Sequence, residues 1–596
     1  MSTLFPTEYA DDETRQEVNY GTVDVPVLII GAGAAGVRTA IELTERDIEC
    51  LVLGKRTHGD AHTTWAAGGI NAAFGNLDPE DDWLIHAADT FDEGHFINDP
   101  TAVETVCKTI PDRVRELDEW GCEFNRTDDG AIDQRYFGAQ AYRRTCYAGD
   151  HTGEAILDTL IDHARELDVS YQENVCITKL LSDGERVYGA AGYDMDDGHF
   201  IRYNAQFVVL AAGGYTAMYK RHTSREDENT ADGAALALDA GAELMDVEFV
   251  QFHPTGMTTP DGVGEEWSGR LVTEAVRGEG GELYNSDEER FMEEYAPDQM
   301  ELAGRDVVAR AIEQEIREGR GTDSGGVYLD ITDEDSEYLE EHVPRMYDRF
   351  DTLGIDLAED PIEVAPSVHY AMGGIDIDFA TGATSVDRLY AVGETTAGVH
   401  GANRLGGNSL AETVTIGTIV GGYIAPRQSS SLPADIAADA ERHFATLAAL
   451  TNADGSEDPR TIISDLSEML WENAGILRDE ERLDDGLAQL DELRERASDL
   501  CVDSGRTGEA FEFALDLHFM LPIAKALLRS AKYRTESRGG HYRTDHDEQD
   551  DDWQQNILCS LEDSEVSLRT RAVGEPSRLV QEAIEEDHEL EYHHLE

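Results

Sequence analysis

The chain has 596 residues and a formal net charge of −77 at neutral pH, and hydrophobic residues make up 40% of it. This length and hydrophobic content predict several packed domains and exclude a disordered chain. A surface this acidic repels nucleic-acid phosphates and anionic lipid headgroups, which argues against nucleic-acid binding and against an electrostatic membrane anchor.

The acidic residues are spread along the whole chain, and lysine occurs only at positions 55, 108, 179, 220, 525 and 532. Such a distribution is typical of a protein from a salt-rich cytoplasm, where molar salt screens the repulsion between like charges. One acidic tail would be the alternative explanation, but the carboxylates are not confined to a tail. We therefore predict a halophilic protein.

Seven cysteines lie far apart and form no C-x-x-C pair, so we expect no metal site, no cysteine-ligated iron–sulfur cluster and no disulfide framework. Residues 1–24 form an acidic leader that we expect to be mobile, and no signal peptide is visible in it. Apolar runs stay shorter than the roughly 18 residues that a membrane span needs. We expect a soluble, intracellular protein.

The first predicted element after the leader is a strand. Val25–Ile30 is a continuous apolar run, which is typical of a strand buried on both faces. It leads directly into Gly31–Gly36, a helical pattern follows, and Ile48–Leu53 is a second apolar run. A strand, a glycine turn, a helix and a strand in this order predict a dinucleotide-binding unit.

The glycines of this turn have separate expected functions. Gly31 makes the tight turn, Gly33 lets the backbone approach a pyrophosphate, and Gly36 lets the helix pack against the strand. An acidic residue that holds ribose hydroxyls usually ends the second strand, but here Lys55 follows it. The alternative is a tight packing turn that binds no ligand.

Two later apolar runs, 207–214 and 388–394, also end in glycine turns. The stretch between them is rich in Glu, Asp and Tyr and has helical patterns near 301–318 and 335–350. We therefore predict a nucleotide-binding fold with an inserted domain, in which the strands before and after the insert belong to the same sheet.

After this insert the sequence changes character. Residues 435–450 and 482–530 alternate polar and apolar side chains with helical spacing and predict a helical domain. From about Tyr542 the chain is acidic and has little periodicity, so we expect an irregular end.

Five segments place cationic or hydrogen-bonding side chains in or beside glycine-rich turns: residues 251–256, 273–281, 302–306, 367–374 and 400–409. Two histidines, two or three arginines and a threonine in one pocket would suit a small dicarboxylate, because arginine contacts a carboxylate through two N–H groups at once. Taken singly, each has a structural explanation, such as a turn histidine or a surface ion pair. Their joint occurrence beside a dinucleotide fold favours a binding site.

From about residue 25 to about residue 560, the sequence resembles the flavoprotein subunit of succinate dehydrogenase and fumarate reductase, and more distantly L-aspartate oxidase. The resemblance rests on motifs in a fixed order: residues 31–36, HTTWAAGGIN (62–71), residues 137–153, QFHPTG (251–256), TEAVRGEGG (273–281), LAGRDVVAR (302–310), VHYAMGG (368–374), HGANRLGGNSL (400–410) and RTESRG (534–539).

The resemblance implies an α/β fold, in which an α+β capping domain interrupts a Rossmann-like FAD-binding domain and a helical domain follows. The corresponding division is an acidic leader (1–24), the FAD-binding domain before the insert (25–252), the capping domain (253–362), the FAD-binding domain after the insert (363–428), the helical domain (429–541) and a C-terminal tail segment (542–596).

The resemblance implies FAD as the cofactor. In that family a histidine directly before threonine carries the flavin covalently, and His62 stands at that place. A solvent-facing loop histidine is the alternative, because Trp65 and Ala67 depart from the family's usual residues. The implied FAD contacts are Gly31, Gly33, Ala34, Ala35, Gly36, Lys55, His62, Thr63, Gly68, Gly69, Asp232, Glu394, Ser409 and Leu410.

The same resemblance implies interconversion of succinate and fumarate by hydride transfer to or from flavin N5. Arg305 corresponds to the proton-transferring residue, and Glu274 and Arg277 correspond to its relay to solvent. The implied clamp of the substrate carboxylates is His253, Thr273, His369 and Arg404.

Electrons from this reaction need an acceptor. The family implies an iron–sulfur subunit, a membrane anchor and a quinone, with the flavoprotein held through these partners on the inner, cytoplasmic face of the cell membrane. The sequence does not decide which direction of the reaction the cell uses.

Two alternatives stay open. L-aspartate oxidase, which converts L-aspartate to iminoaspartate for NAD biosynthesis, is favoured by the loose match of residues 137–153 and of the His62 segment. Leu405–Ser409 and His62 itself favour the succinate and fumarate branch. A flavin-binding relative that has lost catalysis is the other alternative, but intact His253 and Arg305 speak against it.

We expect salt to stabilise the fold. Raising KCl from about 0.1 M to about 1 M shortens the screening length from about 10 Å to about 3 Å and so weakens the repulsion between carboxylates. The melting temperature should rise by at least about 5 °C over this range, as measured by circular dichroism. A melting temperature that stays constant or falls would contradict the halophilic interpretation.

Overall fold

The computed structural model describes residues 4–5, 18–225, 227–259, 264, 267–425, 433–562 and 565–586. Its main sheet has the strand order β6-β2-β1-β9-β8-β7, with β16 beside β9. The bounds of these strands are β1 (Tyr20–Ile30), β2 (Cys50–Leu53), β6 (Ser170–Gln172), β7 (Val175–Ser182), β8 (Val187–Asp194), β9 (Phe200–Leu210) and β16 (Leu389–Ala391).

The centre of the main sheet is parallel. β1 pairs in parallel with β2 on one side and with β9 on the other, and β9 pairs in parallel with β16. Val208 of β9 lies opposite Leu389 of β16, so strands from before and after the insert share one sheet, as predicted. The antiparallel strands β8 and β7 extend one edge.

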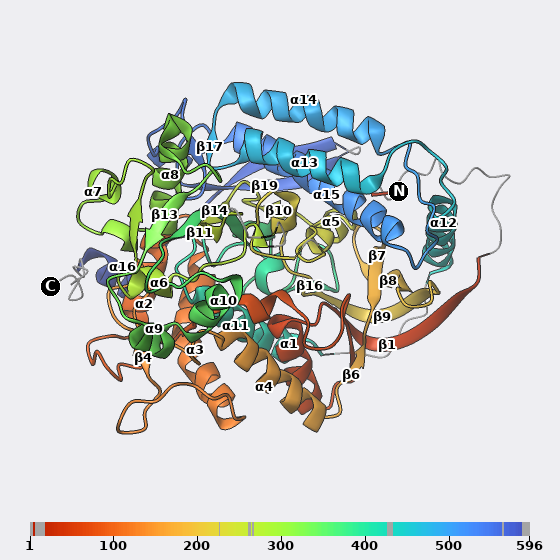
Figure 1. Cartoon of the computed structure of the whole chain (residues 1–596). Coiled ribbons are helices and arrows are strands. Elements are labelled where there is room, and N and C mark those ends of the chain that lie inside the picture. Colours follow the sequence, from red (N-terminus) through yellow and green to blue (C-terminus); the bar gives the residue numbers. More distant parts are fainter. Residues whose placement is uncertain are drawn as a thin grey trace.

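Helices pack around this sheet because each has an apolar face. α1 (Ala34–Glu45) follows the glycine turn and contacts α4 (Thr152–Glu166) and α11 (Asn408–Tyr423), and α11 also contacts α3 (Pro100–Glu119). Figure 1 shows these helices together on the side of the molecule opposite the helices of residues 459–533.

The insert forms a second sheet with the order β11-β14-β13-β12. Its strands are β11 (Val250–Met257), β12 (Glu282–Tyr284), β13 (Val327–Asp330) and β14 (Ile362–Ala371). Its helices are α6 (Ala275–Gly278), α7 (Met292–Tyr295), α8 (Arg305–Glu315), α9 (Ser336–His342) and α10 (Pro344–Leu353), and they share a hydrophobic core separate from that of the main sheet. α8, α9 and α10 confirm the predicted helical patterns. The predicted domain borders at 252/253 and 362/363 fall within β11 and β14, and the division remains a prediction.

The predicted helical region is also confirmed. It comprises α12 (Ala434–Leu450), α13 (Pro459–Ala474), α14 (Glu480–Arg496) and α15 (Glu509–Tyr533). α13, α14 and α15 contact one another and lie side by side along one edge of the molecule (Figure 1). α15 also contacts α5 (Asp232–Asp239), which joins this region to the main sheet.

The end of the chain is regular, which corrects our expectation of an irregular segment. β19 (Gln555–Glu562) and β20 (Glu565–Ala572) form an antiparallel hairpin, and β19 pairs with β10 (Leu244–Met245), which in turn pairs with β15 (Gly374–Ile375). α16 (Arg578–Glu585) packs against α2 (Trp83–Glu93). The periodicity of β19 is hidden because four consecutive residues, 556–559, are buried.

The leader is only partly as we expected. Residues 20–24, which we assigned to a mobile leader, form the first half of β1 and pair with β9. Leu4 and Phe5 are buried, and the ring of Phe5 packs against Phe519 of α15. Among the described helices, none combines the length and the apolar character that a membrane span requires.

Candidate active site

The turn between β1 and α1 packs closely against the neighbouring strand. Gly31 has a φ of +114°, and a Cβ there would lie 2.0 Å from the carbonyl oxygen of Ala211. A Cβ on Gly36 would lie 2.1 Å from the carbonyl oxygen of Gly31. A Cβ on Gly33 would meet only side-chain atoms, the nearer being Thr63 Oγ1 at 3.2 Å. Gly33 therefore faces an open space at the start of α1, where the N-terminal end of the helix dipole favours an anion.

This open space, the cofactor cavity, runs from the glycine turn past the ends of β2 and β9 to the start of α11. Gly36 lies behind the turn and does not line it, and Gly68 and Gly69 line a smaller neighbouring cavity. The predicted FAD contacts that line it are Gly31, Gly33, Ala34, Ala35, Lys55, His62, Thr63, Asp232, Glu394, Ser409 and Leu410.

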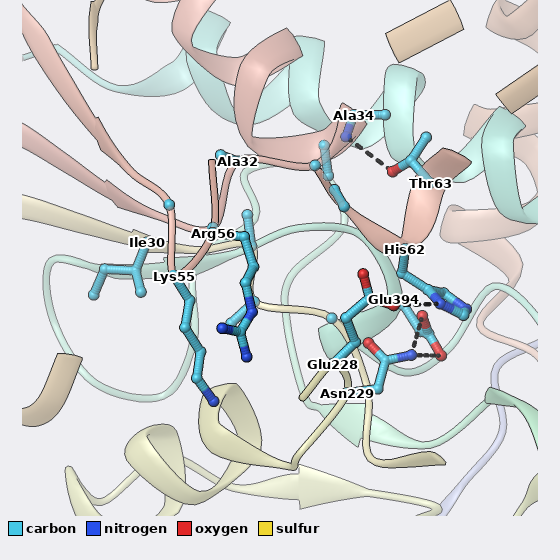
Figure 2. Close-up of a pocket in the computed structure, with 18 of the residues that line it drawn as sticks. Ile30, Ala32, Ala34, Lys55, Arg56, His62, Thr63, Glu228, Asn229 and Glu394 are labelled. Atoms are coloured by element: carbon cyan, nitrogen blue, oxygen red, sulfur yellow. Dashed lines mark hydrogen bonds and ion pairs between the residues drawn. The ribbon is translucent and has the colours of Figure 1, made fainter. Parts of the chain in front are cut away.

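Basic side chains gather at one end of the cofactor cavity (Figure 2). Lys55 Nζ lies 2.7 Å from Asp516 Oδ1, and Arg56 Nη2 lies 2.8 Å from Glu512 Oε1. Burial alone would lower the pKa of Lys55, but the charge of Asp516 raises it above its usual value. Two counter-ions of this basic end, Glu512 and Asp516, therefore come from α15, and Arg56 also pairs with Asp227 at 2.7 Å.

His62 lies at the other end of the cavity (Figure 2), in the 3₁₀ turn η2 (His62–Trp65). Its Nδ1 lies 3.7 Å from Glu228 Oε2, and the amide of Asn229 donates to Glu394 at 3.3 Å. Burial lowers the pKa of His62, but the nearby carboxylates of Glu228 and Glu394 outweigh this effect and raise it. Thr63 Oγ1 accepts a hydrogen bond from Ala34 N, so η2 is tied to the start of α1.

A smaller cavity adjoins the first. Its polar lining includes the predicted substrate residues His253, Thr273, His369 and Arg404 together with the predicted proton-transferring residue Arg305, and we call these five residues the cationic cage. His253 is on β11 and His369 on the neighbouring strand β14, and their ring centroids lie 5.4 Å apart.

Both cavities share part of their walls. Trp65, Ala66, His369 and Ser409 line the cofactor cavity and also the cationic cage. A flat ring bound near His62 would therefore lie against any molecule held in the cage. This arrangement is what electron transfer between a cofactor and a small substrate requires.

Arg404 is the most unusual residue of the cage. It is 2% exposed, yet it forms no ion pair with the described residues. Its Nη1 donates to Ser409 Oγ at 3.1 Å and its guanidinium lies 4.4 Å from the ring centre of Tyr370, but Nε and Nη2 have no hydrogen-bond partner among the described residues. A buried cation without a counter-ion is costly, so this position is built for an anionic ligand.

Glu274 holds Arg305 on the opposite side of the cage. Arg305 Nε donates to Glu274 Oε2 at 2.9 Å, and Arg277 Nη2 lies 3.8 Å from the same oxygen. Burial would raise the pKa of Glu274, but Arg305 and Arg277 lower it, so Glu274 stays ionised. Arg277 lines a separate, larger cleft that Glu274 also lines and that includes the exposed residues 278 and 280. The three predicted catalytic residues are thus in contact, in the order Arg305, Glu274, Arg277.

The cage histidines are neutral. Burial and, next, the charge of Arg305 lower the pKa of His253 well below its usual value. Burial and the charge of Arg404 do the same for His369, whose Nδ1 lies 2.9 Å from Thr223 Oγ1. The positive charge of the cage therefore resides on its arginines, while the histidines offer hydrogen bonds.

Sequence reasoning missed several partners of these residues. Glu228 and Asp516 belong to no motif, and Asp516 lies 461 positions from Lys55, so no local signal could have shown either pairing. Tyr370 and Gln251 stand inside motifs that we had quoted, VHYAMGG and QFHPTG, and their place beside a predicted residue could have suggested them.

Comparison with known proteins gives matches over most of the chain. Residues 26–410 match the family model described as FAD binding domain, and residues 463–583 match the model described as fumarate reductase flavoprotein C-term. A fumarate reductase (CoM/CoB) subunit from Methanothermobacter marburgensis is 43% identical over 90% of this chain and 96% of that protein. A succinate dehydrogenase flavoprotein subunit from Rickettsia felis is 36% identical over 90% of this chain and 93% of that protein.

Solved structures resemble the whole chain as well. Mycobacterium smegmatis Sdh1 in complex with UQ1 has a TM-score of 0.82 and 38% identity, with 94% of this chain and 96% of that chain covered. The quinol fumarate reductase of E. coli has a TM-score of 0.87 and 31% identity, with 94% of this chain and 99% of that chain covered.

The charges of the cage predict how dicarboxylate binding depends on pH. Burial and the charge of Arg305 lower the pKa of Arg404 to about 9, so Arg404 loses its positive charge as the pH rises through that value. The affinity for malonate should therefore be constant between about pH 6 and pH 8, where the histidines are already neutral, and should fall above about pH 9. The measurement is a titration followed by the perturbation of the flavin absorbance. An affinity for malonate that already falls between pH 6 and pH 8 would show instead that a histidine must be protonated for malonate to bind.

Proposed function

The chain belongs to the family of flavoprotein subunits of succinate dehydrogenase and fumarate reductase, and we propose that it interconverts succinate and fumarate with FAD as its redox cofactor. The single observation that carries this proposal is the unpaired, buried Arg404 in a cage that shares a wall with the cofactor cavity. The second arginine, Arg305, supplies a second cationic contact, so the cage can bind a ligand with two carboxylates.

The residues of the chain fit FAD and the substrate in separate ways. The N-terminal end of α1 suits the pyrophosphate, and His62 lies where a flavin ring would meet the cage. FAD, when bound, supplies the group that accepts or gives the two electrons. Arg404, His369, His253 and Thr273 hold the carboxylates, which fixes the two central carbons of the substrate.

Arg305 is the residue that donates or accepts the proton in the proposed reaction. A guanidinium is almost always protonated, so Arg305 is a ready acid for fumarate reduction. To act as a base in succinate oxidation it must first pass a proton on, and the carboxylate of Glu274, which is in direct contact with it, is the group that can take that proton. Glu274 and Arg277 connect Arg305 with the larger cleft, and this supports their assignment as the relay to solvent.

We assign the electron partner and the location as proposals as well. As a subunit of a larger complex, the chain would pass electrons to an iron–sulfur subunit and a quinone, and partner subunits would hold it on the inner face of the membrane. The relatives support a multi-subunit complex through their names, but they differ in the electron partner: one is named for CoM/CoB and one is bound to UQ1. Reconstitution of succinate oxidation with each class of acceptor would decide between them.

The purified, FAD-loaded chain should oxidise succinate with an artificial acceptor and reduce fumarate with a reduced viologen dye. Arg404→Gln should lower kcat/KM in both directions by roughly 10²- to 10³-fold, because one carboxylate loses its cationic partner. Arg442→Gln, on the exposed face of α12, is the matched control and should not change the rate. Turnover of L-aspartate with oxygen, together with no succinate activity, would assign the chain to L-aspartate oxidase and overturn the proposal.

We propose further that His62 carries the flavin covalently, because it lies at the end of the cofactor cavity beside the cage. Acid-denatured protein should then show yellow-green flavin fluorescence on a denaturing gel, and His62→Ser should lose this band while it still binds FAD reversibly. His58→Ser serves as the control, since His58 stacks on Tyr171 and does not line the cavity. Release of all flavin from the unaltered protein by acid would refute the covalent link.

A further inference from the structure

Arg305 is held on two sides. Glu274 Oε2 accepts from Nε and lies 2.8 Å from Nη2, while Gln251 Oε1 accepts from Nη1 at 3.0 Å. A guanidinium has five N–H groups, so one remains free on Nη1 and one on Nη2. Glu274 and Gln251 together therefore determine which N–H groups of Arg305 are available to the cage.

Gln251 can do this only if its amide oxygen points to Arg305. Its Nε2 donates to Asn403 Oδ1 at 2.8 Å and to the carbonyl oxygen of Arg404 at 2.8 Å. A reversed amide would place an NH₂ group against the guanidinium, where two donors would face each other. The orientation of Gln251 therefore depends on the acceptors that face its nitrogen.

Asn403 is oriented in turn by two carboxylates. Its Nδ2 donates to Glu93 Oε1 at 2.7 Å and to Asp306 Oδ1 at 3.0 Å. Because both groups offer acceptors, the amide of Asn403 must turn its nitrogen to them and its oxygen to Gln251. Asn403 and Gln251 are each 1% exposed, so water does not replace these contacts.

The two carboxyl groups differ. Asp306 Oδ2 forms an ion pair with Arg310 at 3.1 Å, whereas Glu93 has no ion pair with the described residues. A Cβ on Gly304 would lie 3.6 Å from Glu93 Oε1 and 3.0 Å from Asp306 Oδ1, so the two acids meet over this glycine. Burial and the charge of Asp306 raise the pKa of Glu93 well above its usual value, which favours the protonated form of Glu93.

We propose that Glu93 is a positioning residue for the proton transfer: through Asn403 and Gln251 it fixes the amide polarity that presents an acceptor, and not a donor, to Arg305. This role rests on the proposed function. Glu93 is the last residue of α2 and does not line the cage, so it touches neither substrate nor cofactor. Its contribution is the direction of a hydrogen-bond chain that ends on the guanidinium.

A second proton route along this chain is the competing explanation. Side-chain amides donate N–H and accept at C=O but have no exchangeable acidic group near neutral pH, so the path from Glu93 to Arg305 does not carry protons as carboxylates do. The contacts therefore favour orientation over transport.

The test compares Glu93→Ala with Glu93→Gln in the FAD-loaded protein. Glu93→Ala removes the nearer of the two acceptors of Asn403 and should lower kcat about tenfold for fumarate reduction and succinate oxidation, with KM changed less than about threefold. The Gln side chain in Glu93→Gln has the same shape as a neutral Glu93 and keeps an acceptor oxygen. This variant should therefore keep kcat within about threefold of that of the unaltered protein. Asp92→Ala, an exposed neighbour on the same helix, is the control and should not change kcat.

A double variant shows whether Glu93 acts through Gln251. Glu93→Ala combined with Gln251→Met should lose no more activity than Gln251→Met alone, because the chain is already broken. Additive losses, or equal losses for Glu93→Gln and Glu93→Ala, would overturn the inference. Flavin content and melting temperature show which variants are folded, and an unaltered protein without succinate or fumarate activity would reject the proposed function instead.

Discussion

The site depends on a buried positive charge that the protein itself does not neutralise. The whole molecule carries a large excess of carboxylates, yet Arg404 is buried without one, and its only hydrogen bond to a side chain among the described residues is to a neutral serine. The folded state therefore bears a cost that a bound dianion removes. Exclusion of acidic side chains from this one position is what makes the cavity selective for carboxylates.

The register of one strand pair builds the cage. His253 on β11 and His369 on β14 lie on neighbouring antiparallel strands whose pairing shifts between Gln251 and Phe252 and again after His253. These irregularities let both rings approach the same space, although successive side chains of a regular strand point to opposite faces. The insert therefore supplies part of the site from β11, from β14 and from the start of α8, whose first residue is Arg305.

Sequence reasoning found what local patterns encode. The glycine turn, the strands on both sides of the insert, the helices of the insert and of the C-terminal region, and the members of the cationic cage all stand in short segments with a recognisable pattern. Sequence reasoning missed contacts between segments that lie far apart in the chain. Glu228 beside His62 and Asp516 beside Lys55 are pairings that only the folded chain creates. The hairpin β19–β20 was missed because β19 buries four consecutive residues and so lacks the alternation of a half-exposed strand.

The ion pair between Lys55 and Asp516 has a consequence for the order of biosynthesis. During translation, the glycine turn, Lys55 and His62 leave the ribosome long before α15 has been made, so in a nascent chain Lys55 still lacks the carboxylate of Asp516. The buried ion pair can therefore form only after α15 has docked, and a product truncated before α15 would lack it even with an intact nucleotide-binding motif.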